Sequence, residues 1–445
     1  MMSQAIKEEN VYTEAFRELQ KRADAQEPSW LKRLRENAFA RFEELGFPTT
    51  KHEEWKYTTL APLAKMRFEQ PGGAVKIDRA QLQRFFYEES DASRLVFVNG
   101  FYSEELSSIE ALSEGIAALD LREALKDAKY AEILREQLAR GADYNENAFT
   151  ALNTALFESG VFIHLPKGVS VDAPIHLLFL SSENEKPALS FPRVMIVAEE
   201  GSSATIIESY ASAGEGSYFT NVVVEIKLAA AARLNYYKVQ RENSKAFHIA
   251  TTHAELGRAS SFNSTTITLG AQLSRHNINI ALSSVGAECW VDGLYIVGEG
   301  QHTDTHSLID HAQPHCTSHQ LYKGILDGKS RAVFNGKVFV RRDAQQTDAM
   351  QTNKNLLLSD EARVDTKPQL EIFADDVKCA HGATVGQLEE EELFYLTSRG
   401  LHTELARNLL TYGFAEEVIE KIRIESIKAE LDEAVLHHLH SNLEA

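Results

Sequence analysis

Cysteine is scarce in this 445-residue chain, which contains only Cys289, Cys316 and Cys379. An odd count without a Cys-x-x-Cys pair argues against a disulfide framework and fits a reducing compartment. Long hydrophobic runs are absent, since no stretch of about 18 uncharged apolar residues is available to cross a membrane. The first ten residues, MMSQAIKEEN, lack the apolar core of a signal peptide and the Arg/Ser richness of a transit peptide. These absences predict a cytoplasmic protein without membrane insertion.

Positive charge is in deficit. The chain has 46 Lys and Arg residues against 65 Asp and Glu residues, which gives a net charge of −19 at pH 7. Proteins that bind duplex nucleic acid need a concentrated basic surface, and no dense Lys/Arg run is present. The excess of acid favours solubility and suits a basic patch on a partner. We therefore expect protein partners and no nucleic acid.

A complete phosphate-binding loop is missing as well. The segment GILDGKS (324–330) ends like such a loop, but the motif needs a glycine five residues before Gly328. Lys323 occupies that position, and Gly324 is one residue too close. The chain is therefore not expected to hydrolyse ATP itself.

The sequence that is present falls into three regions. Residues 1–159 are predicted to be mainly helical, because apolar residues recur at intervals of three to four, as in WLKRLRENAFARFEELGF. Residues 160–388 alternate short β-branched and aromatic runs with small polar turns, which is typical of strands. Helical periodicity returns in residues 389–445. The fold is therefore predicted to be mainly β between two helical ends.

A weak repeat runs through the strand-rich region. A small residue recurs before short apolar runs at spacings of 28, 27, 28, 45 and 30 residues. The positions are Ala204, Ala232, Ala259, Ala287, Ala332 and Ala362. We assign the long interval to an extra segment of about 17 residues, which is the excess of 45 over 28. A period of this size with strand chemistry predicts a solenoid, either a β-helix or a β-roll, with an ordinary sandwich as the alternative.

The C-terminal region contains two apolar stripes at helical spacing. They comprise Leu401, Leu405, Leu409 and Leu410 in the first helix, and Val418, Ile422, Leu431 and Val435 in the second. A two-helix unit of this size buries little surface by itself. The region is therefore either a solvated cap on the solenoid or a surface that docks a partner.

Five of the sixteen histidines lie within twenty residues of one another. With a neighbouring cysteine, they are His302, His306, His311, His315, Cys316 and His319. Even spacings share a face of an extended chain, so some of these side chains could bind a transition metal. The alternative is that each histidine is satisfied by a neighbour in the polar ladders of a solenoid.

The segment DDVKCAHGATVG (375–386) places Cys379 two residues before His381. In a strand the two side chains share a face and could share a metal, or they could simply be packing residues. The segment lies near the end of the strand-rich region, where a solenoid leaves an unpaired strand edge. A partner of the same architecture could continue the sheet there and complete a metal site. Asp375 and Asp376 are candidate hydrogen-bond acceptors for the histidine ring.

At this point the chain resembles the SufB/SufD family of iron–sulfur cluster assembly proteins over nearly its whole length. The residues that carry the resemblance are EEWKYT (53–58), FVNGFYS (97–103), ALNTALFESGVFIHLPKG (151–168), HTDTHSLIDHAQPHCTSHQLYKGIL (302–326), GKVFVRRDAQQTDAMQTNKNLLLS (336–359) and DDVKCAHGATVGQL (375–388). The helical N-terminal region is closer to the SufD members than to the SufB members. Cys316 and the histidines around it depart from the family pattern.

The resemblance implies a right-handed parallel β-helix in a non-catalytic scaffold subunit. Its partners would be SufB and the ATPase SufC, and an isolated chain could form a homodimer. The ATPase would dock on the helices of residues 401–435. At the junction with SufB, His381 would be a ligand of a nascent iron–sulfur cluster or iron, with Cys379 at most auxiliary. The cluster would be transient, so the isolated chain is not expected to hold a cofactor tightly.

A β-helix enzyme that cleaves polysaccharides, either a lyase or a hydrolase, is the competing hypothesis. Such enzymes carry carboxylate or basic clusters in a surface groove and are typically secreted. The missing signal peptide counts against this hypothesis.

Overall fold

The computed structural model describes residues 11–22, 27–69, 71, 77, 82–112, 115–182 and 186–440. The segment compared above with signal peptides and the last five residues of the C-terminal region lie outside this description. Among the described residues, no helix is both long enough and apolar enough to cross a membrane.

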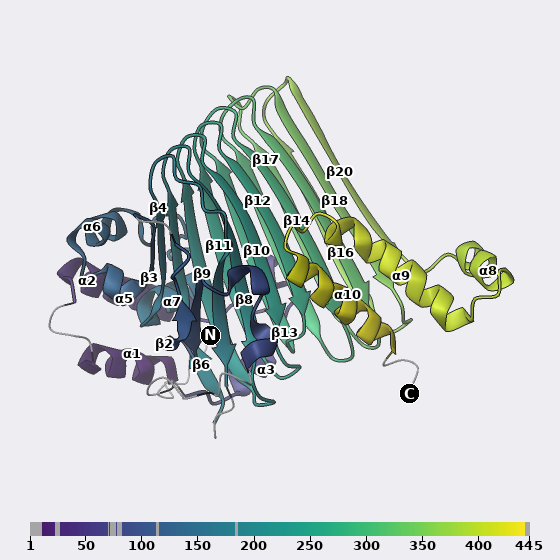
Figure 1. The fold of residues 1–445 in the computed structure, drawn as a ribbon, viewed down its shortest axis with the longest axis horizontal. Helices are drawn as coiled ribbons and strands as arrows, with labels where there is room; N and C mark the ends of the chain where they lie inside the picture. The colour runs from purple at the N-terminus through teal and green to yellow at the C-terminus, as the bar shows by residue number, and fades with distance from the viewer. Residues whose placement is uncertain are drawn as a thin grey trace, which may run out of the picture.

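The strands form two parallel-stranded sheets that face each other and advance together along the molecule (Figure 1). The first sheet contains, in spatial order, β2 (Phe101–Ser108), β1 (Arg94–Val98), β5 (Ile175–Ser181), β8 (Ser203–Ser212), β10 (Arg233–Arg241), β12 (Ser261–Leu269), β14 (Glu288–Val297), β16 (Thr317–Leu326), β18 (Thr347–Leu357) and β20 (Val377–Gly386). The second contains β19 (Arg363–Ile372), β17 (Arg331–Val340), β15 (His302–His311), β13 (Leu273–Leu282), β11 (Phe247–Leu256), β9 (Tyr218–Leu228), β7 (Arg193–Ala198), β4 (Gly160–Leu165) and β3 (Ala117–Asp120), with β6 (Ala188–Ser190) on β9.

From β7 onward successive long strands alternate between the two sheets, so each turn adds one strand to each sheet. The predicted β-solenoid is confirmed, with about eight turns. Among the strands of the described residues, only the pairs β1–β2 and β3–β4, at the N-terminal end, are antiparallel. Side chains alternate between the interior and the two outer faces, as strand geometry requires.

The predicted extra segment of about 17 residues does not exist. Register partners in the first sheet follow one another at 28, 27 and 29 residues through Arg233, Ser261, Glu288 and Thr317. Cys316 precedes Thr317 as Ala287 precedes Glu288, so Cys316 fills the small position of its turn. Ala332 lies in the second sheet. The 45-residue interval from Ala287 to Ala332 therefore consists of one full turn to Cys316 and about half a turn more, which ends in the second sheet.

Charged side chains also lie inside the solenoid. Glu208 and Lys238 are buried register partners on adjacent turns, with Nζ 3.8 Å from the carboxylate. Tyr210 and Tyr236 donate hydrogen bonds to the same carboxylate. The ammonium group of Lys238 also lies 3.2 Å from Nε2 of His248. Buried ions are tolerated only with partners of this kind, so the contacts tie neighbouring turns together.

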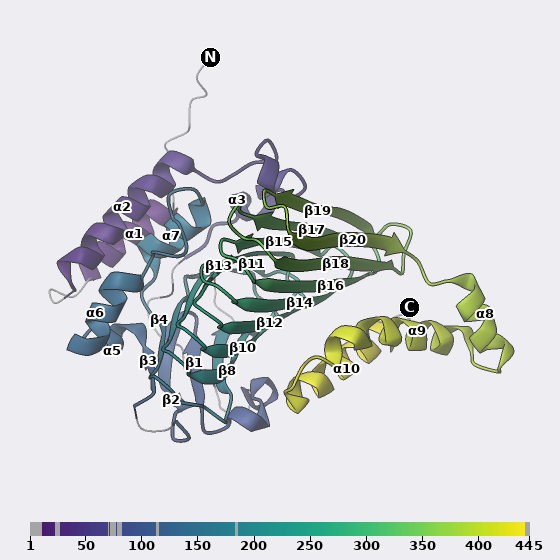
Figure 2. The same ribbon diagram turned by 90° about the horizontal axis from the view of Figure 1, so that it is seen from above.

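Helices cover the outer faces of both sheets on opposite sides (Figure 2). The N-terminal ones are α1 (Val11–Arg22), α2 (Ser29–Leu45), η1 (Glu53–Trp55), α3 (Ala61–Lys65), η2 (Gln83–Phe85), η3 (Glu88–Ser90), α5 (Leu121–Ala124), α6 (Ala128–Gln137) and α7 (Ala148–Leu156). Helices α1, α2 and α7 share a buried apolar cluster with the second sheet, in which Phe149 packs 6.2 Å from Phe219, centroid to centroid.

The C-terminal helices are α8 (Glu390–Ser398), α9 (Thr403–Ile419) and α10 (Glu425–His440). Helices α9 and α10 pack on the outer face of the first sheet, where Val418 and Ile422 join Ile267 and Leu294 in one apolar cluster. Helix α8 has no buried residue and extends beyond the end of the sheets, next to α9 (Figures 1 and 2).

Candidate functional site

The solenoid stops at two unpaired strand edges, which we call the open end. Strand β19 pairs only with β17, and β20 pairs only with β18. In the part of the chain that the structure describes, no strand pairs with their other edges. Unpaired N–H and C=O groups along an edge are a template for another strand. The open end is therefore a surface on which a second chain can extend both sheets.

Cys379 and His381 lie on β20 with their side chains directed toward the interior at the open end. Cys379 continues the buried row formed by Cys289, Ser318 and Ala349. His381 lies two residues further and is the register partner of Gln351, which is buried. The shared face predicted from strand alternation is thus present. Cys379 is partly buried, whereas His381 is exposed because no further turn covers it.

The two side chains differ in their chemistry. Burial, together with the nearby carboxylate of Asp348, raises the pKa of the Cys379 thiol. Since the thiolate is the form that binds metals, this thiol is a poor ligand at neutral pH without help from a metal or a partner. The imidazole of His381 is accessible and binds a metal in its neutral form. Two side chains do not complete a metal site, so further ligands must come from outside these two residues.

Asp375 and Asp376 do not lie beside His381, contrary to the expectation for the ring acceptor. Asp376 is in the turn before β20, where its backbone carbonyl accepts a hydrogen bond of 2.6 Å from the backbone N–H of Gln346. Five residues of extended chain separate it from His381, which is about 16 Å at strand spacing. Asp376 therefore stabilises a turn rather than the histidine ring.

The histidines of residues 302–319 are divided between two sheets and a turn. His302, His306 and His311 are on β15 of the second sheet, and His319 is on β16 of the first. His315 lies in the connecting turn with a φ of 60°. Among the described residues, no group of three or more His, Cys, Asp or Glu side chains is arranged to hold a metal ion.

Most of these histidines contact a neighbour within the chain. The ring of His302 lies 2.9 Å from Oγ1 of Thr58, and His311 lies 2.8 Å from Oγ of Ser318. His319 stacks on Trp290 with the ring centroids 5.8 Å apart. Contacts of this kind, in which a histidine ring meets a neighbouring side chain, were the alternative to metal binding.

The EEWKYT segment contacts buried polar side chains on β13 and β15. Thr58 donates a 2.5 Å hydrogen bond to Asp304, which is buried and also paired with Arg275 at 2.6 Å. Trp55 lies under the Arg275 guanidinium, which is 3.9 Å from the ring centroid. Arg275 and His306 outweigh the effect of burial and hold the pKa of Asp304 well below its usual range. The segment thus fastens the N-terminal region to the outer face of the second sheet.

His311 gives a testable acid sensitivity. Burial lowers its pKa to about 4, and it is buried against Ser318 inside the solenoid. Because the unfolded chain takes up this proton at about pH 6.5, folding stability is lost as pH falls from about 6.5 to about 4. The His311→Gln variant has no imidazole to titrate at this position. As pH falls over that window, its unfolding free energy should therefore decrease by about 3 kcal/mol less than that of the wild type. Urea unfolding midpoints at a series of pH values measure the difference, and parallel curves would contradict it.

The predicted docking residues are only partly accessible. Leu405 and Leu409 are 55% and 50% exposed, and Leu401 and Leu410 are partly exposed. Phe394 and Tyr395 of α8, which the sequence did not single out, are 73% and 57% exposed. Exposed apolar side chains are therefore present on α8, on α9 and in the loop between them.

Val418 and Ile422 do not belong to that surface. Both are buried between the C-terminal helices and the outer face of the first sheet. Their stripe packs inside the chain and holds α9 and α10 in place. The expectation that they contact a partner is therefore corrected.

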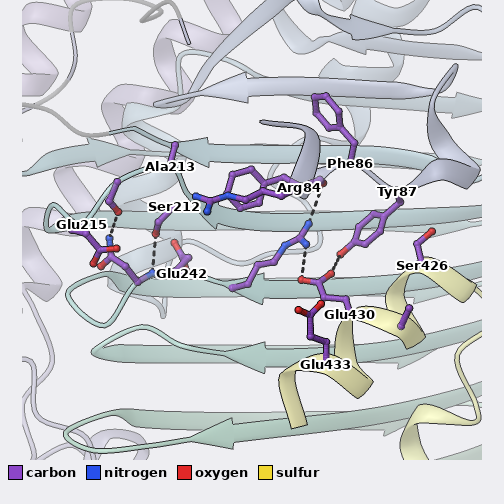
Figure 3. Close-up of a pocket in the computed structure, with 15 residues that line it drawn as sticks. Arg84, Phe86, Tyr87, Ser212, Ala213, Glu215, Glu242, Ser426, Glu430 and Glu433 are labelled. Carbon is purple, nitrogen blue, oxygen red and sulfur yellow. Dashed lines mark hydrogen bonds and ion pairs between the residues drawn. The ribbon is translucent and has the colours of Figure 1, made fainter. Parts of the chain in front are cut away.

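A pocket of about 800 Å³ separates α10 from the turns at the ends of β8 and β10 (Figure 3). At one side of it Glu430 of α10 accepts hydrogen bonds from Arg241, at 2.5 Å, and from the hydroxyl of Tyr87, at 2.8 Å. Ser426 of α10 contacts Glu89 of η3 in the same region. The C-terminal helices are thus connected to the solenoid and to the N-terminal region by polar contacts as well as by apolar packing.

Two family models together cover most of the chain. Residues 179–414 match the model described as SUF system FeS cluster assembly, SufBD core domain, and residues 6–177 match the SufBD protein N-terminal region. The first match spans the solenoid from β5 onward and includes both Cys379 and His381.

Similar proteins carry the same description. An iron–sulfur cluster assembly SufBD family protein of Synechocystis is 38% identical over 92% of this chain and 91% of its own length. The iron–sulfur cluster assembly protein SufD of Escherichia coli is 34% identical over 87% of this chain and 88% of its own. SufD of Bacillus subtilis is 28% identical over 91% and 93%. The chain belongs to the SufBD family of iron–sulfur cluster assembly proteins.

Proposed function

We propose that this chain is a non-catalytic scaffold subunit that joins SufB through the open end and SufC through the exposed surface of α8 and α9. The observation that carries the proposal is the open end itself, where Cys379 and His381 face the interior of a solenoid that stops. A second β-solenoid placed there would pair with β19 and β20 and bring its own side chains up to His381. The complex would act in the cytoplasm.

The nascent cluster is the cargo of this junction. His381 would supply one nitrogen ligand, and the partner's side chains would supply the remaining ligands. Cys379 would assist at most, because its thiol has a raised pKa and is partly buried. A site divided between two chains exists only in the assembled complex, which suits transient holding and release of a cluster.

Energy from ATP would enter through the partner. Gly328, in the segment that resembles a phosphate-binding loop, lies in the turn between β16 and β17 with a φ of 55°. Its backbone N–H donates a 2.8 Å hydrogen bond to the side chain of Asp327 within the same turn.

Co-purification tests the proposal. The tagged full chain is co-expressed with SufB and SufC and purified without oxygen, and both partners should be retained in amounts comparable to the chain. Reconstitution with ferrous iron and sulfide should then load iron and sulfide onto the complex, while a preparation of SufB and SufC alone should load less.

Two results would overturn it. The first is a chain that purifies without either partner although both are expressed, and the second is a chain that raises no cluster loading over SufB and SufC alone. Cleavage of a pectin-like polymer by the purified chain would favour the enzyme hypothesis instead. A homodimer that dissociates when SufB is added would support the open end as the shared contact surface.

A further inference from the structure

A buried amide lies directly below His381 in the solenoid. Gln351 of β18 is the register partner of His381 on β20 and is 1% exposed. Its Nε2 donates a 2.8 Å hydrogen bond to Oε1 of Gln320, one turn further in. Its Oε1 is buried and has no hydrogen-bond partner among the described residues. Buried acceptors are satisfied in the great majority of cases, so this oxygen calls for an explanation.

The Gln351 amide ends a chain of polar contacts that runs inward. Oγ of Ser307 lies 2.9 Å from Nε2 and 3.1 Å from Oε1 of Gln320, and a hydroxyl can accept from the first or donate to the second. In the arrangement that the structure shows, Gln320 presents its Oε1 to Nε2 of Gln351, which leaves Oε1 of Gln351 without a partner among the described residues. The amide thus offers an acceptor, which is what a ring N–H requires.

The position of the amide is fixed by the opposite sheet. Gly336 of β17 faces it, and a Cβ added at Gly336 would lie 2.6 Å from Nε2 of Gln351. The absence of a side chain at Gly336 therefore makes the room that Gln351 occupies. The acceptor without a partner is therefore part of a closely packed layer, one strand away from the open end.

We propose that Gln351 positions His381 for metal binding, by accepting a hydrogen bond at Oε1 from one ring N–H of the imidazole. Neighbouring strands are about 4.8 Å apart, so register partners on one face are within side-chain reach. The ring of His381 is exposed, and among the described residues no strand lies beyond β20 to hold it in another position. This hydrogen bond fixes the tautomer and leaves the other ring nitrogen unprotonated for iron.

The inference rests on the proposed function, because it supplies the acceptor that a histidine ligand needs. It replaces Asp375 and Asp376, which lie at the preceding turn. Gln351 does not touch the cargo, and it acts only through His381.

Three variants of the full chain separate this role from packing. Gln351→Leu removes the acceptor and keeps a buried side chain. Gln351→Glu keeps an acceptor oxygen, and the Gln320 amide can reverse to donate to the new carboxylate because Oγ of Ser307 can donate to Oε1 of Gln320. Asn353→Leu is the matched control, since Asn353 is another buried amide on β18 whose register partner is Ala383. Circular dichroism and thermal unfolding of each variant report stability.

The first readout is nuclear magnetic resonance of the full chain labelled with ¹⁵N at the histidine rings, with His381 assigned by its loss in His381→Ala. One tautomer should dominate in the wild type, in Asn353→Leu and in Gln351→Glu, while Gln351→Leu should show the mixture typical of a free imidazole.

The second readout is anaerobic binding of ferrous iron to the complex with SufB and SufC. Gln351→Leu should weaken iron binding about 10- to 100-fold, and Gln351→Glu should recover most of the loss. The inference is overturned if Gln351→Leu keeps the wild-type tautomer and iron affinity although His381→Ala loses iron. Wild-type iron binding by His381→Ala would instead overturn the proposed metal role of the junction.

Discussion

The His381→Ala variant is expected to assemble with SufB and SufC but to form at least about tenfold less cluster than the wild type. The imidazole is exposed at the open end, so its removal takes away a ligand without opening a buried cavity. Cys379→Ala should give a milder decrease, because that thiol has a raised pKa and packs beside Ala349. Iron and sulfide contents after anaerobic reconstitution, with the cluster absorption band, measure both effects.

The exposed histidine His52 provides the control, because it is on neither β19 nor β20 and its ring accepts a 3.0 Å hydrogen bond from the backbone N–H of Thr49 in its own turn. His52→Ala should load cluster as the wild type does, and all three variants should retain wild-type thermal unfolding. If His381→Ala builds wild-type amounts of cluster on an intact complex, then Cys379 and His381 are packing residues. The metal chemistry would then have to be sought elsewhere, with the histidines of residues 302–319 tested next.

The double variant Leu405→Asp/Leu409→Asp is expected to weaken ATPase binding at least about a hundredfold. Burying a leucine contributes roughly 1.5–3 kcal/mol, and every 1.4 kcal/mol is a factor of ten in affinity. An aspartate in their place adds the cost of an unpaired charge in an apolar contact. Both leucines are at least half exposed, so the fold should be unaffected. Titration of the purified chain with SufC measures the dissociation constant.

A control for added charge is available at two other exposed apolar positions. Ile109 and Val285 are 41% and 42% exposed and lie outside the C-terminal helices. Ile109→Asp/Val285→Asp should bind SufC with unchanged affinity. Retention of SufC by the leucine variant at wild-type affinity would show that α8 and α9 are not the docking surface.

Strand alternation and the period of small residues were enough to predict the solenoid and the common face of Cys379 and His381. Both depend on local backbone geometry, which the sequence records directly. The same counting produced an error at Cys316, because that cysteine replaced the alanine of its turn and the next match lay in the other sheet. A motif defined by residue type cannot distinguish a long turn from a change of sheet.

Contacts between segments that are distant in the chain could not be predicted from the sequence. The stripe with Val418 and Ile422 was identified correctly as apolar, but periodicity does not say whether a stripe meets a partner or the chain's own sheet. The contact of Thr58 with Asp304 spans 246 residues. Gln351 was missed for a related reason: its importance lies in an unpaired oxygen below His381, which only the register of two strands reveals.

The buried ion pairs between adjacent turns help the chain to avoid pairing its strands in the wrong order. Successive turns of a solenoid are nearly equivalent, so a strand that skips its neighbour is a competitor of similar energy. If β8 paired with β12, Glu208 would meet Thr266 and Lys238 would be expelled or left without its counterion. Arg275 and Asp304 mark the rung between β13 and β15 in the same way. We expect these two ion pairs to favour the native strand pairing over alternatives of similar energy, and so to fix the order of the turns during folding.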